Sequence, residues 1–199
     1  MGRLPVWGVV TAAAAPILLV AGWTIAARLQ PGSFDAVTET ISDLAGADAS
    51  QRWVMTTAIL GTGACQVATA VALRPAALPG RLVYATGGVC TILVGLNPLP
   101  TAGQSATVHA VAAAGSFAAL ATWPLASWRR GESVAWGLRR DVALTAGCGL
   151  MAVTAWFFHD AVAEGATVGL SERAAAVLLN VWPLAVALSV RRLSARSPR

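Results

Sequence analysis

Long apolar stretches alternate with short polar segments along almost the whole chain. Six of them approach the length of about 20 residues that an α-helix needs to cross the hydrocarbon core of a bilayer. We therefore predict an all-α, polytopic membrane protein, a single six-helix transmembrane bundle over residues 1–199. The first stretch exceeds the usual apolar core of a signal peptide, so we expect it to be retained. The predicted spans are Pro5–Ala27, Trp53–Leu73, Arg81–Leu96, Ala106–Trp128, Asp141–His159 and Arg173–Val190.

Arginine positions predict the orientation of these spans. If the N-terminus lies inside, only Arg28, Arg52 and Arg173 fall on the outer side, and every other arginine falls in a cytoplasmic segment. Basic residues are concentrated in the cytoplasmic loops of membrane proteins. We therefore predict that both termini are cytoplasmic and that the longest loop, between spans one and two, lies outside.

Composition excludes several classes of protein. Apolar residues make up 56% of the chain and charged residues only 12%, whereas a soluble domain carries about 25% charged residues. The net charge of +5 follows from membrane topology, so we expect no nucleic-acid partner. Cys65, Cys90 and Cys148 each lie in an apolar stretch without a Cys-x-x-Cys or Cys/His spacing, which argues against a disulfide framework or a metal site.

The first outer loop carries an amphipathic pattern. Its apolar residues recur at spacings of three and four, which predicts a helix of about ten residues at the membrane surface or in the mouth of the bundle. Glu39 and Asp43 are four residues apart and would share one face of that helix. The apolar residues are Phe34, Val37, Ile41 and Leu44.

Ionisable groups near the hydrocarbon layer are costly and are therefore candidates for function. Asp43 and Glu39 in the first outer loop, His109 early in span four, and His159 with Asp160 at the end of span five form one candidate catalytic constellation at the outer side. A carboxylic acid that holds its proton at neutral pH is what general acid catalysis requires. Each residue also has an ordinary alternative role, as a solvated loop acid, a helix cap or a structural histidine.

Aromatic and amide residues supply candidates for substrate binding. Ring faces stabilise cations by roughly 0.5 to 2 kcal/mol, although tryptophan is also favoured at membrane interfaces. Trp123 and Trp182 each precede a proline inside a span, where a kink opens space beside the ring. Asn180, inside span six, has the alternative of bonding a neighbouring helix. The candidates are Trp23, Trp53, Trp123, Trp156, Phe157, Trp182, Phe117, Asn97 and Asn180.

Several catalytic motifs do not occur in the sequence. There is no Asp-rich magnesium motif and no phosphate-cradling glycine loop. Neither a Gly-x-Ser-x-Gly elbow nor a His-Glu-x-x-His zinc pair is found. We therefore expect no metal and no cofactor, and any chemistry would be metal-independent and confined to the outer half of the bundle.

The block Ile41–Leu44 (Ile-Ser-Asp-Leu), the Gly95–Pro98 segment and His109 carry a resemblance to the bacterial integral membrane family catalogued as "domain of unknown function 998". The resemblance covers most of the chain through span six, but Ala45 stands where the family usually has glycine. It implies a six-helix fold, a bacterial cytoplasmic membrane and no established activity. A fainter likeness to small actinobacterial membrane-bound terpene cyclases, which act on prenylated substrates, rests on size, span count and acidic outer loops.

Three functions fit these features. The first is a membrane-embedded terpene cyclase, in which Asp43 or Glu39 protonates a prenylated lipophilic substrate within an aromatic-lined outer cavity and His109 or a nearby base removes the final proton. The second is a non-enzymatic protein that binds or transports a lipid or another small molecule. The third is a membrane partner subunit. The expected partners are a lipophilic prenylated molecule and membrane lipid, and the sequence leaves homo-oligomerisation open.

Overall fold

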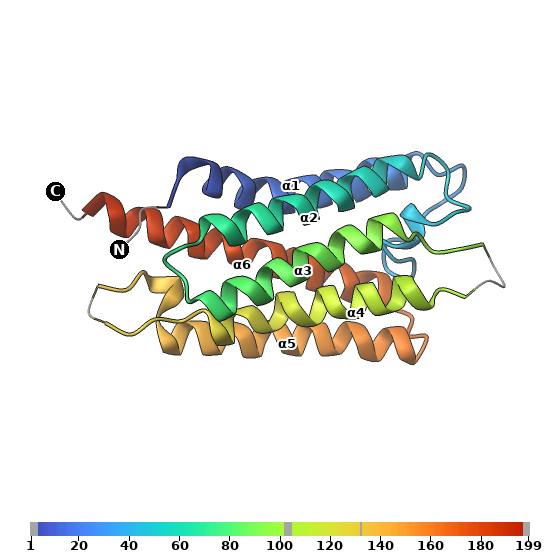
Figure 1. The fold of residues 1–199 in the computed structure, drawn as a ribbon. Coiled ribbons are helices and arrows are strands. Elements are labelled where there is room, and N and C mark those ends of the chain that lie inside the picture. The colour runs from blue at the N-terminus through green and yellow to red at the C-terminus, as the bar shows by residue number, and fades with distance from the viewer. Residues whose placement is uncertain (1–3, 102–104, 132, 197–199) are drawn as a thin grey trace.

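The computed structural model describes residues 4–101, 105–131 and 133–196. Within these residues there are six long helices and no strand (Figure 1). All six are long and apolar enough to cross a membrane when α4 is counted together with the 3-10 turn that continues it to Ala126, so the predicted all-α, six-span architecture is confirmed. The long helices are α1 (Val6–Arg28), α2 (Trp53–Ala72), α3 (Leu78–Leu96), α4 (Thr107–Thr122), α5 (Arg140–Val162) and α6 (Val168–Arg196), with the short 3-10 helices η1 (Asp43–Ala45), η2 (Trp123–Ala126) and η3 (Trp136–Leu138).

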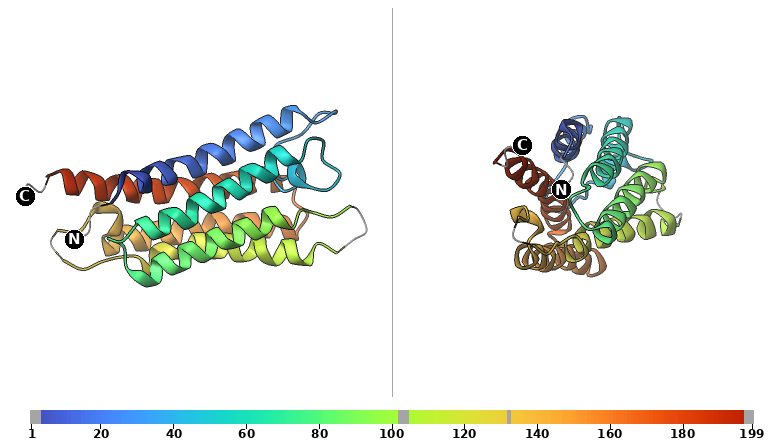
Figure 2. Two further views of the ribbon diagram at one scale, coloured as in Figure 1. Left: turned by 45° about the horizontal axis from the view of Figure 1, so that its top comes forward. Right: turned by 60° about the vertical axis from the view of Figure 1, so that its left-hand side comes forward.

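The helices run up and down and form a closed ring. Each helix lies beside the next one along the chain, and α6 returns to lie beside α1 (Figure 2). The start of α1 and the end of α6 lie at one end of the bundle, and residues 29–52 lie at the opposite end (Figure 1). We call the end with residues 29–52 the outer end and the other the inner end, following the predicted orientation, which is still a prediction.

Small residues bring neighbouring helices close together. A Cβ atom at Gly63 of α2 would lie 2.8 Å from the carbonyl oxygen of Gly88 in α3, and one at Gly22 of α1 would collide with Ala58 of α2. Close approach through glycine and alanine is a general device of transmembrane helix packing. The first three helices therefore form a tightly packed wall.

The last helix begins at Val168 rather than at the predicted Arg173. Ser171 and Glu172, whose polarity lowers the local hydropathy, are both buried, at 0% and 4% exposure. Their polar atoms are hydrogen-bonded within the protein, which removes much of the cost of burying them. An acidic residue therefore lies inside the bundle near its outer end.

The predicted amphipathic helix in the first outer loop is wrong. Turns lie at residues 36–38 and 41–42, and in residues 35–45 only Asp43–Ala45 are helical, as the short η1. Carboxylates accept backbone N–H groups that a helix would use: Asp43 Oδ2 accepts a 2.7 Å hydrogen bond from the Thr40 N–H, and Glu172 Oε2 accepts one from the Ile41 N–H. Bonds from side chains to these backbone groups compete with helix formation.

Candidate functional site

Residues 35–45, which we call the outer cap, are held against the start of α6. Arg173 donates from Nη1 to the carbonyl oxygens of Ala36 (2.9 Å) and Glu39 (2.7 Å) in the cap, and to that of Gly169 (2.9 Å) in its own helix. A Cβ atom at Gly169 would collide with the Glu39 carbonyl oxygen. Glycine at this position therefore lets the cap lie directly on α6.

Glu172, the neighbour of Arg173, holds the inner face of the cap. Its Oε2 accepts a hydrogen bond from the backbone N–H of Ile41, and its Oε1 accepts one of 3.2 Å from Ser42 Oγ. The residue is only 4% exposed. Burying a carboxylate is costly unless its oxygens are hydrogen-bonded. The bonds from Ile41 and Ser42 therefore offset part of the cost of burying Glu172.

His109 extends this contact into a chain of three polar side chains. Its Nδ1 lies 2.8 Å from the carbonyl oxygen of Asn97, and its Nε2 lies 3.3 Å from Ser42 Oγ. Because a carbonyl oxygen only accepts, the hydrogen-bond network assigns a proton to Nδ1. Ser42 therefore stands between Glu172 and His109, with one hydroxyl proton to donate to either of them. This arrangement can pass a proton between the imidazole and the carboxyl group.

An interior cavity of about 70 Å³ lies beneath Ser42, and Glu172 is at its outer end. Residues from α1, α2, α3, α4 and α6 line it, and most are apolar. Phe117 lines it as well, with its ring centroid 4.8 Å from that of Phe157. At about 30 Å³ per water molecule in the liquid, the cavity has room for about two waters. Its other polar lining residues are Thr62, Gln66, Thr91, Ser116 and Asn180.

Gln66 and Asn180 form a polar pair in the wall of this interior cavity. Gln66 Nε2 donates to Asn180 Oδ1 at 2.9 Å, and Asn180 Nδ2 donates to the Ala176 carbonyl oxygen at 2.9 Å. Gln66 is 1% exposed, and its Oε1 accepts no hydrogen bond from the described residues. Rotating the Gln66 amide by half a turn would place Gln66 Oε1 against Asn180 Oδ1, and two oxygen acceptors cannot bond each other. The pair therefore leaves one buried acceptor unpaired in the wall of the cavity. Its α6 member, Asn180, lies about 12 Å from Glu172 along the helix axis, at 1.5 Å per residue.

Glu39 and Asp43 lie on the other side of the cap. Both line a bowl of about 650 Å³ that is open at the outer end. Asp43 Oδ2 accepts hydrogen bonds of 2.7 Å from the backbone N–H and from the hydroxyl of Thr40, while the Asp43 N–H donates to Thr40 Oγ1 at 3.1 Å. The two carboxylates thus line one bowl, although they do not share a helix face as predicted, and neither lines the interior cavity.

The Ile41–Leu44 block separates these two spaces. Ile41 and Ser42 line the interior cavity, whereas Asp43 and Leu44 line the outer bowl. Leu44 is 1% exposed and Ile41 5% exposed, so the apolar members of the block are buried as their pattern indicates. The block is a thin partition between the two spaces. Glu172 bonds its first two residues, and Thr40 bonds Asp43.

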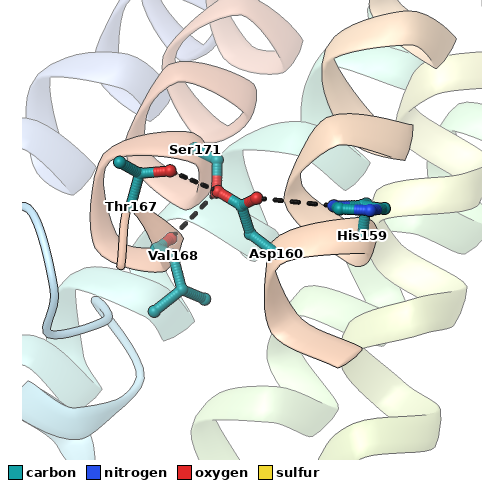
Figure 3. A network of polar contacts seen from close by, with 5 residues as sticks. All are labelled: His159, Asp160, Thr167, Val168 and Ser171. Carbon is teal, nitrogen blue, oxygen red and sulfur yellow. Dashed lines mark hydrogen bonds and ion pairs between the residues drawn. The ribbon is translucent and has the colours of Figure 1, made fainter. Parts of the chain in front are cut away.

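His159 and Asp160 take no part in this arrangement. Figure 3 shows Asp160 in the last turn of α5, where its Oδ2 accepts a 2.6 Å hydrogen bond from the hydroxyl of Thr167, the residue before α6. The His159 side chain is 78% exposed and lies 3.6 Å from Asp160 Oδ1. Neither residue lines the interior cavity. Asp160 joins two helices, and His159 lies beside it at the surface.

Three of the predicted tryptophans lie at the outer surface or against the cap. The Trp23 ring centroid is 5.9 Å from the Arg173 guanidinium carbon. This ring therefore contacts a cation of the protein itself rather than the predicted substrate cation. Trp53 is 61% exposed, and its Nε1 donates to Gln51 Oε1 at 2.8 Å. Trp156 is 41% exposed. None of the three lines the interior cavity.

Trp123 and Trp182 pack within the protein. Trp123 is fully buried, with its ring centroid 5.0 Å from that of Tyr84, and the Trp182 ring lies edge-on to Trp136 at 5.8 Å. Of the aromatic residues predicted to bind substrate, only Phe117 lines the interior cavity. An aromatic-lined cavity is therefore not confirmed. Asn180 and Phe117 line the cavity, and Asn97 holds His109.

Sequence analysis did not single out Glu172, Ser42 or Gln66. Gln66 carried a usable signal, because a side-chain amide inside a predicted span is itself a candidate for function. Glu172 was not chosen because the predicted sixth span began only at Arg173, which placed Glu172 in a loop. Ser42 was not chosen because it was assigned to the predicted amphipathic helix. Across the described ranges, no group of three or more His, Cys, Asp or Glu residues is placed to hold a metal ion.

Comparison with known proteins gives one match. A family model described as "Protein of unknown function (DUF998)" matches residues 13–189. This range covers most of the chain and includes the outer cap, the interior cavity and all the residues that join them. No curated protein and no solved structure matches the chain.

Proposed function

Because the chain belongs to the DUF998 family of proteins of unknown function, the activity has to be inferred from the site, and we propose that the protein binds a lipophilic small molecule in its interior cavity. The observation that carries this proposal is the free Gln66 Oε1 in an otherwise largely apolar wall. A buried acceptor without a donor costs about 1 to 3 kcal/mol. A ligand with an apolar body and a hydroxyl or amine group would supply the missing donor.

The shape of the site supports an amphiphilic ligand. Glu172 lies at the outer end of the interior cavity and Gln66 deeper in the bundle, with apolar residues such as Leu19 and Ile59 also lining the cavity. Sites for drug-sized molecules measure about 300 to 1,000 Å³, so a volume of about 70 Å³ admits only part of such a molecule. Binding a whole prenyl or acyl chain requires Phe117 and neighbouring side chains to move aside.

A binding experiment with geranylgeraniol tests this proposal, because the alcohol combines a hydroxyl donor with a prenyl chain. The thermal unfolding midpoint of the purified chain in detergent is measured with and without the alcohol, since a ligand that binds only the folded state raises it. Ala113 lines the interior cavity, whereas Ala114 of the same helix is exposed. The variant Ala113→Leu fills the cavity, and Ala114→Leu is the matched control.

We expect the alcohol to raise the midpoint of the wild type and of Ala114→Leu, and to leave that of Ala113→Leu unchanged. An equal rise in all three proteins would mean that the alcohol binds elsewhere. No rise in the wild type would mean that this prenyl alcohol does not bind, and it would leave water as the simplest occupant.

Proton-initiated terpene cyclisation is a second candidate, favoured by the Glu172–Ser42–His109 chain. In this mechanism the Glu172 carboxyl group donates its proton to a terminal alkene of a prenylated substrate. The next double bond attacks the resulting cation and forms a ring, and a final proton returns from carbon to the carboxylate. The returned proton regenerates the acid for the next turnover, and the Ser42 hydroxyl, which lies between Glu172 and His109, would orient the carboxyl group. The bonds that form and break leave the product an isomer of the substrate.

The cyclase candidate has its own test. Membranes that contain the wild type or Glu172→Gln are incubated with farnesylated or geranylgeranylated compounds, and the extracts are searched for an isomer of unchanged mass. We expect an isomer from the wild type and at least a 10²-fold slower formation from Glu172→Gln, the usual cost of losing a general acid. If the wild type forms no isomer, cyclisation of these compounds is excluded and the binding proposal is unaffected.

A further inference from the structure

The inner end of the bundle has a groove that the proposed function does not use. It has a volume of about 450 Å³ and lies between the connection from α4 to α5 and the last turns of α6. Arg139 and Arg192 line it from these two elements. Leu188 and Leu193 of α6 also line it, so cationic and apolar groups meet in one groove.

These two arginines differ from most of their neighbours. The Arg130 and Arg140 guanidinium groups lie 5.3 and 5.5 Å from the centre of the Trp128 ring. Arg129 donates to the carbonyl oxygens of residues 75 and 76. Within the described ranges, neither Arg139 nor Arg192 forms an ion pair, a side-chain hydrogen bond or a cation–π contact. Both are exposed and free to bind an anion.

Trp136 adds an exposed aromatic ring to the groove. It lines the same surface and is 51% exposed. Tryptophan rings favour the headgroup level of a bilayer, and a guanidinium group binds phosphate oxygens in pairs through its planar fork. An interfacial ring, two free arginines and leucine side chains match a phosphate headgroup with an attached acyl chain.

We propose that this groove binds an anionic phospholipid, with the headgroup phosphate held by Arg139 and Arg192 and an acyl chain along Leu188 and Leu193. Basic pockets between transmembrane helices bind anionic headgroups in this way. The inner end is the cytoplasmic end in the predicted orientation. The proposal is independent of the interior cavity, which lies towards the outer end of the bundle.

Native mass spectrometry of the full chain in detergent micelles tests this proposal. Dioleoyl phosphatidylglycerol and dioleoyl phosphatidylcholine have the same acyl chains and differ in headgroup charge. We expect phosphatidylglycerol to bind the wild type at least fivefold more than phosphatidylcholine does. In the double variant Arg139→Gln with Arg192→Gln, that preference is expected to disappear.

The control removes the same charge at the other end of the bundle. Arg28 and Arg52 are exposed at the outer end, and the double variant Arg28→Gln with Arg52→Gln should keep the wild-type preference. If the glutamine pair at the groove fails to fold, Arg139→Lys with Arg192→Lys retains the charge and loses the planar fork, and it should give an intermediate preference. Equal binding of the two lipids to the wild type, or equal loss of preference in both glutamine pairs, would overturn the proposal.

Discussion

Glu172 accepts a hydrogen bond from the backbone N–H of Ile41, a residue 131 positions earlier in the chain. The next residue, Arg173, donates to carbonyl oxygens of the same loop. Two consecutive residues of α6 therefore hold the outer cap. Glu172 accepts from the Ile41 N–H and the Ser42 hydroxyl, and Arg173 donates to backbone carbonyl oxygens. The cap consequently has one defined position over the interior cavity, although most of it is not helical.

Removing the Glu172 carboxyl group should destabilise the cap. Glu172→Leu leaves the buried N–H of Ile41 without an acceptor, and we expect a loss of about 1 to 3 kcal/mol in the free energy of unfolding. Glu172→Gln keeps one acceptor oxygen and should lose about half as much. Equilibrium unfolding in mixed micelles measures both.

Asp43→Asn is the matched control for the loss of a carboxylate. Asp43 is exposed and bonds within the cap, to Thr40, and asparagine caps nearly as well as aspartate. We expect a loss below about 0.5 kcal/mol, which is usual for surface substitutions. A larger loss for Asp43→Asn than for Glu172→Leu would show that the cap is held from its outer face.

Gly169→Ala should displace the outer cap, because the added methyl group would collide with the carbonyl oxygen of Glu39. Gly32→Ala is the control, since no atom lies within 4 Å of a Cβ at that position. The readout is the rate at which a thiol reagent labels a cysteine placed at Ser42, in a background without the native cysteines. We expect faster labelling with Gly169→Ala and an unchanged rate with Gly32→Ala. Equal rates in both would mean that the cap does not depend on this close approach.

The Gln66–Asn180 pair should behave non-additively. Gln66→Leu or Asn180→Leu alone removes the direct hydrogen bond and leaves a buried amide without its partner, at a cost of about 1 to 3 kcal/mol. The double substitution removes both polar groups and should cost less than the sum of the two. A double-mutant cycle in mixed micelles measures the difference. Additive losses would mean that the two amides do not stabilise each other.

Orientation is testable by labelling from one side. Ala47, at the outer end, and Ser133, at the inner end, are both exposed. In a background where Cys65, Cys90 and Cys148 are replaced by serine or alanine, an impermeant thiol reagent added to intact cells should label Ala47→Cys and not Ser133→Cys. The reverse pattern would place the outer bowl in the cytoplasm.

The sequence predicted the six helices because their apolar stretches are long and nearly free of charge. The prediction failed in the first outer loop, where polar side chains form hydrogen bonds with residues far away in the sequence. Apolar spacing around Val37 and Ile41 is typical of a helix. However, Glu172 accepts the Ile41 N–H, and Arg173 donates to backbone carbonyl oxygens of the cap. A pattern in one segment carries no information about a donor that lies far along the chain.

The candidate site was predicted only in part, because some of its residues are brought together only by contacts between distant segments. His109 and Asn180 were found because polar residues within spans are conspicuous, and both are at or beside the interior cavity. The five candidate tryptophans were chosen by residue type and, for Trp123 and Trp182, by an adjacent proline, and none of them lines the cavity. Burial of Glu172 depends on Ile41 and Ser42, which only the folded chain brings to it.

Photolabelling tests the central claim, binding in the interior cavity, most directly. A geranylgeraniol analogue that carries a diazirine on its chain is irradiated with the protein in membranes, and the modified residues are located by peptide mass spectrometry. We predict labelling of cavity residues such as Ser116 and Asn180, with loss of that labelling in Ala113→Leu and its retention in Ala114→Leu. Labelling confined to exposed residues such as Val111 and Leu178, unchanged by Ala113→Leu, would contradict the claim.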